Sequence, residues 1–234
     1  MFIYECKLTL MENTFFSSRE INNFYQTEPL IGNYALAYAL NFVEAPYDNK
    51  GEIHYYEDLS KLNNVRIYIT PAKFTGKVKF SLSQFNSISD SYWSKMEQNA
   101  ISTNKQKKAE PINYPQIGFI KMLSVCNTAR FYVFSEKDIQ IKKYIRLGKF
   151  MSKAKVETEK VNFKVIENQD FLSKHILNPL DIPKSCIFKA FDTYSVNPTT
   201  LIDNVSLKGD CYKFSDIELP VGMKFGIDFL KGKK

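Results

Sequence analysis

Residues 2–10 place apolar side chains at every second position, and this alternation constrains the fold more than any other feature of the sequence. Period-two alternation with aromatic and branched residues predicts a strand that buries one face. Ser17-Ser18-Arg19-Glu20 then fits a capping box, which predicts the start of a helix. Residues 34–42 (YALAYALNF) predict a short helix, and residues 65–69 predict a second strand. The first 70 residues therefore predict the order strand, helix, strand.

This order is the opening half of a ferredoxin-like βαββαβ unit, a fold shared by many RNA-binding modules. Residues 117–125 and 129–134 predict an apolar hairpin at the centre of the sheet. We predict an α+β fold in which residues 1–169 form a ferredoxin-like, RRM-related core. Within it, residues 75–116 become polar and are expected to form a protruding hairpin insertion. Residues 170–234 are expected to add a small, mostly β C-terminal extension.

Length and composition are those of a globular protein. The chain has 234 residues, of which 44% are hydrophobic and 24% charged. No stretch approaches about 18 consecutive apolar residues, so no transmembrane helix is predicted. Residues 1–7 contain neither a basic region nor a long apolar run. We therefore expect no signal peptide and a cytoplasmic location.

The charge and the aromatic content favour nucleic acid as a partner. The net charge is +7 and aromatic residues make up 15% of the chain. The alternative is a mildly basic surface over a Phe-rich core. The first 60 residues carry 3 basic and 9 acidic side chains, whereas the rest carries 29 basic and 16 acidic. This asymmetry suggests a basic surface facing an anion and an acidic surface facing solvent or a protein.

Common catalytic and metal sites have no support in the sequence. The two histidines, His54 and His175, lie far apart, and the four cysteines include no C-x-x-C pair. No glycine-rich phosphate-binding or dinucleotide-binding motif occurs, and no G-x-S-x-G motif occurs either. We therefore predict no cofactor, no bound metal and no catalytic residue.

Two segments are candidates for nucleic-acid binding. Residues 142–160 carry seven basic and two acidic side chains, and Gly148 permits a tight turn or a close approach by a phosphate. The alternative is a solvated basic helix or loop. Residues 98–113 hold three lysines and follow two aromatic residues, and the alternative is a surface loop without a binding role. The candidate residues are Arg146, Lys149, Lys153 and Lys155 in the first segment, and Tyr92, Trp93, Lys105, Lys107 and Lys108 in the second.

Four blocks of the sequence occur in a particular order and spacing. They are residues 6–42 (CKLTL to YALNF), 70–74 (TPAKF), 92–98 (YWSKMEQ) and 144–157 (YIRLGKFMSKAKVE). Together they resemble the Cas-five-type (Csc-one) subunits of type I-D CRISPR Cascade complexes. The resemblance covers residues 1–160, and the C-terminal third adds little to it.

The resemblance implies a RAMP protein with a ferredoxin-like core and a protruding thumb. Such subunits cap the 5′ handle of the CRISPR RNA and lie between a Cas-seven-type backbone subunit and a Cas-ten-like large subunit. The complex recognises DNA by base pairing, and contact of this chain with target DNA near the flanking motif stays open. The two basic segments would contact the handle, and Arg19 and Asn33 are further candidates near the first helix. For Tyr34 and Tyr38, packing in the core is the expected role.

Two other classes of function stay open. Some relatives in other CRISPR subtypes cut precursor RNA without metal, by general acid–base chemistry. A base for such an endoribonuclease would be His54, His175 or a Tyr–Lys pair, and nothing in the sequence places these beside the basic segment. The other alternative is a module that binds only proteins. A membrane surface is not expected, because no basic amphipathic helix with a broad apolar face occurs.

Overall fold

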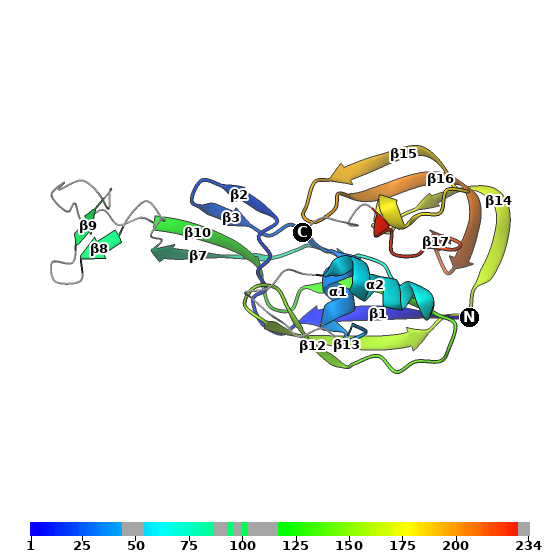
Figure 1. Cartoon of the computed structure of the whole chain (residues 1–234), viewed down its shortest axis with the longest axis horizontal. Helices are drawn as coiled ribbons and strands as arrows, with labels where there is room; N and C mark the ends of the chain where they lie inside the picture. Colours follow the sequence, from blue (N-terminus) through cyan, green and yellow to red (C-terminus); the bar gives the residue numbers. More distant parts are fainter. Residues whose placement is uncertain (44–53, 87–92, 96–99, 103–116, 229–234) are drawn as a thin grey trace.

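The computed structural model describes residues 1–43, 54–86, 93–95, 100–102 and 117–228, without the side chains of residues 86, 93–95 and 100–102. This part of the chain is mostly β and forms a main sheet, a protruding arm and a C-terminal sheet (Figure 1). Its two α-helices are α1 (Asn33–Ala39) and α2 (Tyr55–Asn64). Within these residues, no helix is long and apolar enough to cross a membrane.

The main sheet is built around β1 (Phe2–Leu10), which pairs antiparallel with β11 on one edge and with β13 on the other. The predicted alternation is confirmed, because Cys6 and Leu8 are fully buried while Lys7 is exposed. In spatial order, the strands are β12 (Tyr144–Leu147), β13 (Ser152–Lys160), β1, β11 (Thr128–Ser135), β6 (Ala72–Phe74) and β4 (Leu30–Ile31), and β5 (Ile67–Ile69) pairs with β11 beside β6.

The helical predictions were partly wrong. The helix predicted at 34–42 is α1, which contacts β12 and β5. The capping box at residues 17–20 starts no helix. Instead, β2 (Arg19–Ile21) and β3 (Phe24–Gln26) form a hairpin there. Pairing of β3 with another strand outweighs the local helical signal. A second helix, α2, forms over residues 55–64 and buries Leu59 and Leu62.

The arm consists of β2, β3, β7 (Phe80–Asn86) and β10 (Ile117–Leu123), and it extends away from the rest of the molecule (Figure 1). Beyond it, β8 (Trp93–Lys95) pairs with β9 (Ala100–Ser102). The predicted insertion at 75–116 thus contains β7, β8 and β9, and residues 87–92, 96–99 and 103–116 lie outside the described residues.

The predicted apolar hairpin at 117–134 was also wrong in its pairing. β11 lies inside the main sheet as expected, but β10 pairs with β7 and β3 in the arm. The intervening turn bonds to the end of β1, because Cys126 N–H donates to the Leu10 carbonyl and Leu10 N–H donates to the Asn127 carbonyl. Cys126 has a φ of 66°. The chain therefore passes from arm to main sheet here instead of folding back on itself.

The C-terminal sheet contains β14 (Lys164–Ser173), β16 (Leu201–Phe214), β15 (Ile187–Tyr194) and β17 (Ile217–Pro220). It packs on the main sheet through aromatic pairs, with ring centroids 5.1 Å apart for Tyr132 and Phe214 and 5.7 Å apart for Phe134 and Tyr212. The mostly β character predicted for residues 170–234 agrees with this sheet. The boundary predicted after residue 169, however, falls inside β14.

A buried carboxylate holds the junction of these parts. Asp181 ends a short 3₁₀ helix, Pro179–Asp181, and its side chain accepts hydrogen bonds from Asn33 Nδ2 at 2.6 Å and from the Tyr68 hydroxyl at 2.9 Å. The backbone N–H of Gly226 donates to it at 2.7 Å. Burial raises the pKa of Asp181 to about 7. One side chain therefore joins α1, β5 and the C-terminal segment.

Candidate nucleic-acid interface

The basic residues predicted at 142–160 are gathered by a β-hairpin. We call β12, β13 and the turn between them, residues 148–151, the basic hairpin. Tyr144 pairs with Lys155 and Arg146 pairs with Lys153, so these four side chains project from the same face. The side chains of Ile145, Leu147, Ala154 and Val156 project from the other face and are buried. The alternation of apolar and basic residues therefore turns one charged face outward.

The turn of the basic hairpin is fixed by Gly148, whose φ is 71°. A Cβ at this position would collide with the carbonyl oxygen of Phe15. The neighbouring Lys149 N–H donates to that oxygen at 2.8 Å, and the rings of Phe15 and Phe150 lie 5.2 Å apart. The Lys149 side chain is consequently exposed at a well-defined position in the turn.

The cations of the basic hairpin differ in how far carboxylates neutralise them. Lys155 forms an ion pair with Glu157 at 2.6 Å, which raises the pKa of Lys155. Arg146 donates to the Met151 carbonyl at 3.0 Å and lies 3.9 Å from a Glu12 carboxylate oxygen. Within the described residues, neither the Lys149 nor the Lys153 ammonium group forms an ion pair with a carboxylate, although the Lys153 backbone N–H donates to a Glu12 carboxylate oxygen at 2.8 Å.

One aromatic side chain on this face was not among the predicted contacts. Lys153 Nζ lies 4.8 Å from the ring centroid of Tyr144, which is 49% exposed. An exposed aromatic ring beside a cation suits a base and its phosphate. Tyr144 lies within the predicted basic segment, and this position could have identified it as a candidate for contact with RNA.

The charged face continues onto the neighbouring strands of the main sheet. Lys7 pairs with Glu157 on one side and with Arg130 on the other, and Arg130 pairs with Lys73. Paired residues project from the same face, so these cations form a row across β1, β11 and β6. We call this row and the outward residues of the basic hairpin the basic sheet face. Sequence reasoning missed Lys7, Lys73 and Arg130, although the alternation in β1 would have placed Lys7 outward.

Acidic residues moderate this face on the side of the C-terminal sheet. Arg130 Nε lies 3.5 Å from a Glu5 carboxylate oxygen, and Lys73 forms a 2.7 Å ion pair with Asp203. Lys7 has no carboxylate within ion-pair distance among the described residues. The least neutralised cations are therefore Lys7, Lys149 and Lys153, toward the hairpin side of the sheet.

The other predicted contacts lie elsewhere. Arg19 is on β2 in the arm, where its Nε lies 2.8 Å from a Glu28 carboxylate oxygen. Asn33 is only 1% exposed and donates to Asp181, which corrects its place among the predicted RNA contacts. Trp93 belongs to β8, without a described side chain. Tyr92, Lys105, Lys107 and Lys108 lie outside the described residues.

Tyr34 and Tyr38 pack within the structure, as expected for them. Tyr34 is 2% exposed, and its ring lies 6.0 Å from that of Phe225. The Tyr38 hydroxyl donates to Asp58 at 2.9 Å. Neither ring is therefore presented for stacking on a base.

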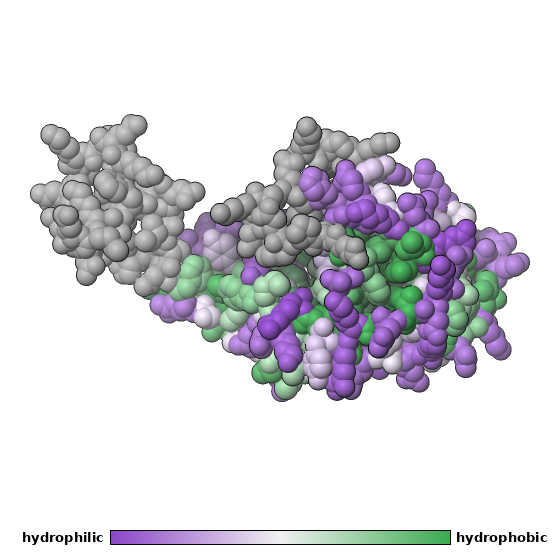
Figure 2. All heavy atoms as spheres, turned by 60° about the horizontal axis from the view of Figure 1, so that its bottom comes forward, coloured by the Kyte–Doolittle hydropathy of each residue, from purple (hydrophilic) through white to green (hydrophobic). Residues whose placement is uncertain are grey.

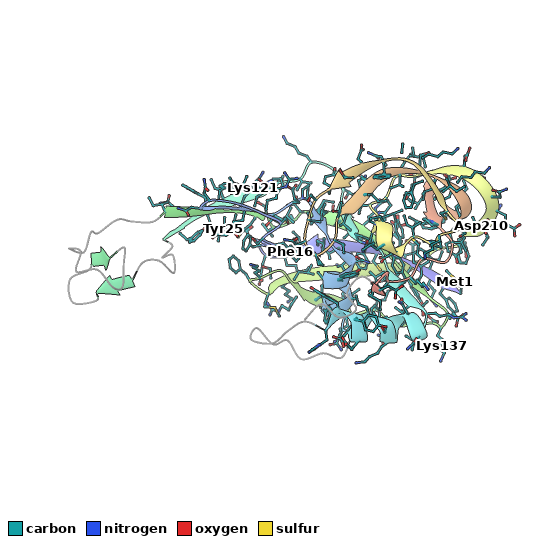
Figure 3. The ribbon with its side chains drawn as sticks, turned by 45° about the horizontal axis from the view of Figure 1, so that its top comes forward. Met1, Phe16, Tyr25, Lys121, Lys137 and Asp210 are labelled. Carbon is teal, nitrogen blue, oxygen red and sulfur yellow. The ribbon has the colours of Figure 1, made fainter. Side chains whose placement is uncertain are left out.

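The arm has an exposed apolar face of its own. The register places Ile21, Phe24, Phe119, Leu82 and Phe80 on one side of the sheet, together with Lys121, whose Nζ lies 4.2 Å from the ring centroid of Phe80. Leu82 is 62% exposed and Ile21 is 61% exposed. In Figure 3, Lys121 and Tyr25 mark opposite sides of the arm. In Figure 2, apolar side chains gather where the arm leaves the body.

The histidines considered as general bases are separated from the basic sheet face by position or by burial. His175 is 3% exposed, and its Nε2 lies 2.9 Å from both Thr70 Oγ1 and the Pro71 carbonyl. Burial lowers its pKa to about 3. His54 is exposed at the beginning of α2. In the described part of the chain, no three His, Cys, Asp or Glu side chains are grouped to hold a metal ion.

Comparison with protein families identifies the chain. The family model described as type I-D CRISPR-associated protein Cas5/Csc1 matches residues 1–228. The protein belongs to this family, and it is therefore a CRISPR effector subunit. The family resemblance seen in the sequence is confirmed. No curated protein matched the chain.

Two solved structures are similar to this chain at low sequence identity. One is a chain of the cryo-EM structure of the type III-B Cmr-beta complex bound to cognate target RNA and AMPPnP. It has a TM-score of 0.46 and 13% identity, over 87% of this chain and 86% of that chain. The other is the crystal structure of a CRISPR protein from Archaeoglobus fulgidus. It has a TM-score of 0.41 and 10% identity, over 93% and 98% of the two chains.

Proposed function

We propose that this protein is a non-catalytic subunit of a type I-D CRISPR surveillance complex and that its basic sheet face binds and caps the 5′ handle of the CRISPR RNA. The observation that carries the proposal is the row of cations on one face of paired strands, with exposed Tyr144 among them. Phosphates bind such cations through charge, and an exposed ring can stack on an unpaired base.

The proposal includes a ferredoxin-like RAMP core. The strands β13, β1, β11 and β5 lie in the spatial order fourth, first, third, second, which is that of a ferredoxin-like sheet. Both α-helices lie between β1 and β5 in sequence, where the first helix of such a unit belongs. Where the second helix would follow β11, this chain has a loop and the additional strand β12.

The proposed protein partners are a Cas-seven-type backbone subunit and a Cas-ten-like large subunit. The arm supports this part, because its exposed apolar face suits burial against another subunit. Contact with target DNA near the flanking motif belongs to the same proposal, since bound DNA would lie close to the capped end of the RNA.

The test compares guide-RNA binding by complexes assembled with variant subunits. Lys149→Gln with Lys153→Gln removes two cations that have no carboxylate partner, so the ion pairs of the fold stay intact. The matched control is Lys137→Gln with Lys164→Gln, two exposed lysines outside the basic sheet face. Binding of a synthetic guide RNA is measured between about 50 and 200 mM salt. Affinity that depends on phosphate contacts falls steeply over this range.

We expect weaker binding by the double variant and a salt slope shallower by about 1.4, since each lost single-strand phosphate contact removes about 0.7. The control complex should keep the wild-type slope. Equal slopes for all three complexes would mean that the basic sheet face is only a solvated surface. Precursor-RNA cleavage that His54→Ala abolishes would instead support the endoribonuclease.

A further inference from the structure

β15 forms an open edge of the C-terminal sheet. It pairs with β16 along one side only, and β16 lies between β15 and β14 (Figure 1). Along its other side, no backbone hydrogen bond joins β15 to any described residue. An open edge presents unpaired N–H and C=O groups, which form a template for another strand.

The side chains of β15 are unusually exposed for a strand of eight residues. All its residues up to Thr193 are exposed, on both faces of the sheet. They include Ile187 at 61%, Phe188 at 39% and Phe191 at 48%, and the two phenyl rings meet edge to face at 5.8 Å. Exposed apolar side chains on an open edge carry a cost in solubility and are usually avoided.

The opposite edge of the same sheet is guarded. β14 carries the charged residues Lys164, Glu167 and Asp170, and a bulge between Ile166 and Gln169 interrupts its pairing. Charges and bulges are the usual protection of an edge strand. β15 has two such irregularities, on either side of Ala190, and two charged residues. Both charges have partners within the sheet, because Lys189 forms an ion pair with Asp170 at 2.7 Å and Asp192 accepts from Asn204 at 2.8 Å. What distinguishes β15 from β14 is its pair of exposed phenyl rings in contact with each other.

We propose that β15 accepts an extended segment of another protein subunit as an additional strand of the C-terminal sheet. The inference rests on the proposed role of this chain as a subunit of a larger complex. Free backbone groups in a row are matched by the backbone of a second polypeptide, and alternate apolar side chains of that segment would cover Phe188 and Phe191. The sheet edge therefore selects a protein segment with alternating apolar residues.

Other occupants fit this edge less well. A nucleic-acid strand has no backbone N–H groups to complete the ladder. A second copy of this chain carries the same net charge of +7, which repels it. At the end of β15, a hollow of about 330 Å³ is lined by residues 195–197 and by residues 18–21, which include strand β2 of the arm. A segment that runs along β15 would reach this hollow.

Hydrogen exchange of the amides tests the proposal. Exchange is followed for residues 187–194 in the isolated full-length protein and in the complex assembled from the co-expressed subunits. Alternate amides of β15 should exchange at least about tenfold more slowly in the complex, because an added strand bonds only the groups that point outward. Unchanged exchange in an intact complex would overturn the proposal.

A variant pair identifies the side-chain contribution. Phe191→Glu should release one protein subunit from the complex, whereas Val165→Glu, at a 52% exposed position on the guarded edge β14, should not. Both variants are first compared with the wild type by thermal unfolding. If Phe191→Glu releases a subunit but the β15 amides are not protected in the wild-type complex, the partner contacts the side chains and adds no strand. If the isolated chain forms concentration-dependent dimers, the occupant is a second copy of this chain.

The outcome is separable from that of the proposed function. The salt dependence of guide-RNA binding depends on Lys149 and Lys153, which lie in another sheet from β15. A complex with the expected salt dependence but unprotected β15 amides would contradict the strand addition alone.

Discussion

Two buried ionisable side chains, Asp181 and His175, give the stability of this protein opposite dependences on pH. Burial raises the pKa of Asp181 from 3.8 to about 7 and lowers the pKa of His175 from 6.5 to about 3. Between pH 3.8 and about 7, the folded protein keeps a proton on Asp181 that the unfolded chain releases, so a rise in pH disfavours folding. His175 acts in the other direction below pH 6.5, because only the unfolded chain binds its proton.

Comparing the wild type with a variant of either residue should reveal the contribution of that residue to the pH dependence of stability. As the pH rises from about 5 to 7, we expect the wild type to lose stability relative to Asp181→Asn and to gain stability relative to His175→Gln. Urea denaturation at both pH values gives the free energies of unfolding. Parallel pH profiles of the wild type and both variants would contradict the assignment, since other groups contribute equally to all three.

At the same scale, the sequence identified charges better than it identified burial. The density of lysines at 142–160 indicated the basic hairpin, because charge density is a local property. Asn33 was misplaced because its partner, Asp181, lies 148 positions away in the sequence. The row of Lys7, Arg130 and Lys73 was missed for the same reason, since strand pairing brings together residues from three separate segments.

Among the elements, the junction between β7 and the turn after β10 depends on one side chain. Asn127 is 6% exposed, and its amide nitrogen donates to the carbonyls of Lys79 and Ser124 at 2.7 and 2.9 Å. Its amide oxygen accepts from the Lys79 N–H at 3.0 Å. The side chain thereby replaces backbone pairing where the ladder between arm and main sheet is interrupted.

We expect Asn127→Ala to lower the free energy of unfolding by about 1–3 kcal/mol, because it removes three partly buried hydrogen bonds to the backbone of Lys79 and Ser124. Urea denaturation measures the loss. The matched control is Asn23→Ala, which removes one exposed 3.4 Å hydrogen bond to the Ile117 carbonyl and should change stability by less than about 0.5 kcal/mol. Equal effects of the two substitutions would show that the Asn127 junction has no special role.

The elements that sequence reasoning misassigned lie in or beside the arm. The capping box was a valid local signal, but the residues after Ser17, its predicted N-cap, are held by β structure: Ser18 Oγ accepts the backbone N–H of Glu28 at 3.1 Å, and β2 begins at Arg19. Long-range pairing decided the structure of residues 19–26. The strand patterns of β1 and β11 were clear because β1 alternates over most of its length, whereas β11 is a continuous apolar strand buried on both faces from Phe131 to Ser135.

On the scale of the whole molecule, the main sheet and the C-terminal sheet share one hydrophobic core. Buried residues from both belong to a single contiguous cluster that extends from Ile3 and Phe131 to Phe214 and Phe225. The predicted mostly β extension contains β15, β16 and β17. Its predicted start after residue 169 falls inside β14, because the charged residues of that strand interrupt its apolar pattern.

A shared core predicts that the two sheets unfold together. We expect a single thermal transition whose calorimetric enthalpy equals its van't Hoff enthalpy. Differential scanning calorimetry of the full chain measures both quantities. Two resolved transitions, or a calorimetric enthalpy well above the van't Hoff value, would show that residues 170–234 form an independent folding unit.

The attachment of the arm has a mechanical consequence. β10 leads into β11 through four residues, and β11 is bonded to β1 on one edge and to β5 and β6 on the other. In engineering terms, the arm is a cantilever whose root is clamped inside the sheet. Interstrand hydrogen bonds lie perpendicular to the strands, so a pull along β10 loads many of them in shear at once. Tension on the arm is thus spread over the body and does not peel away a single strand.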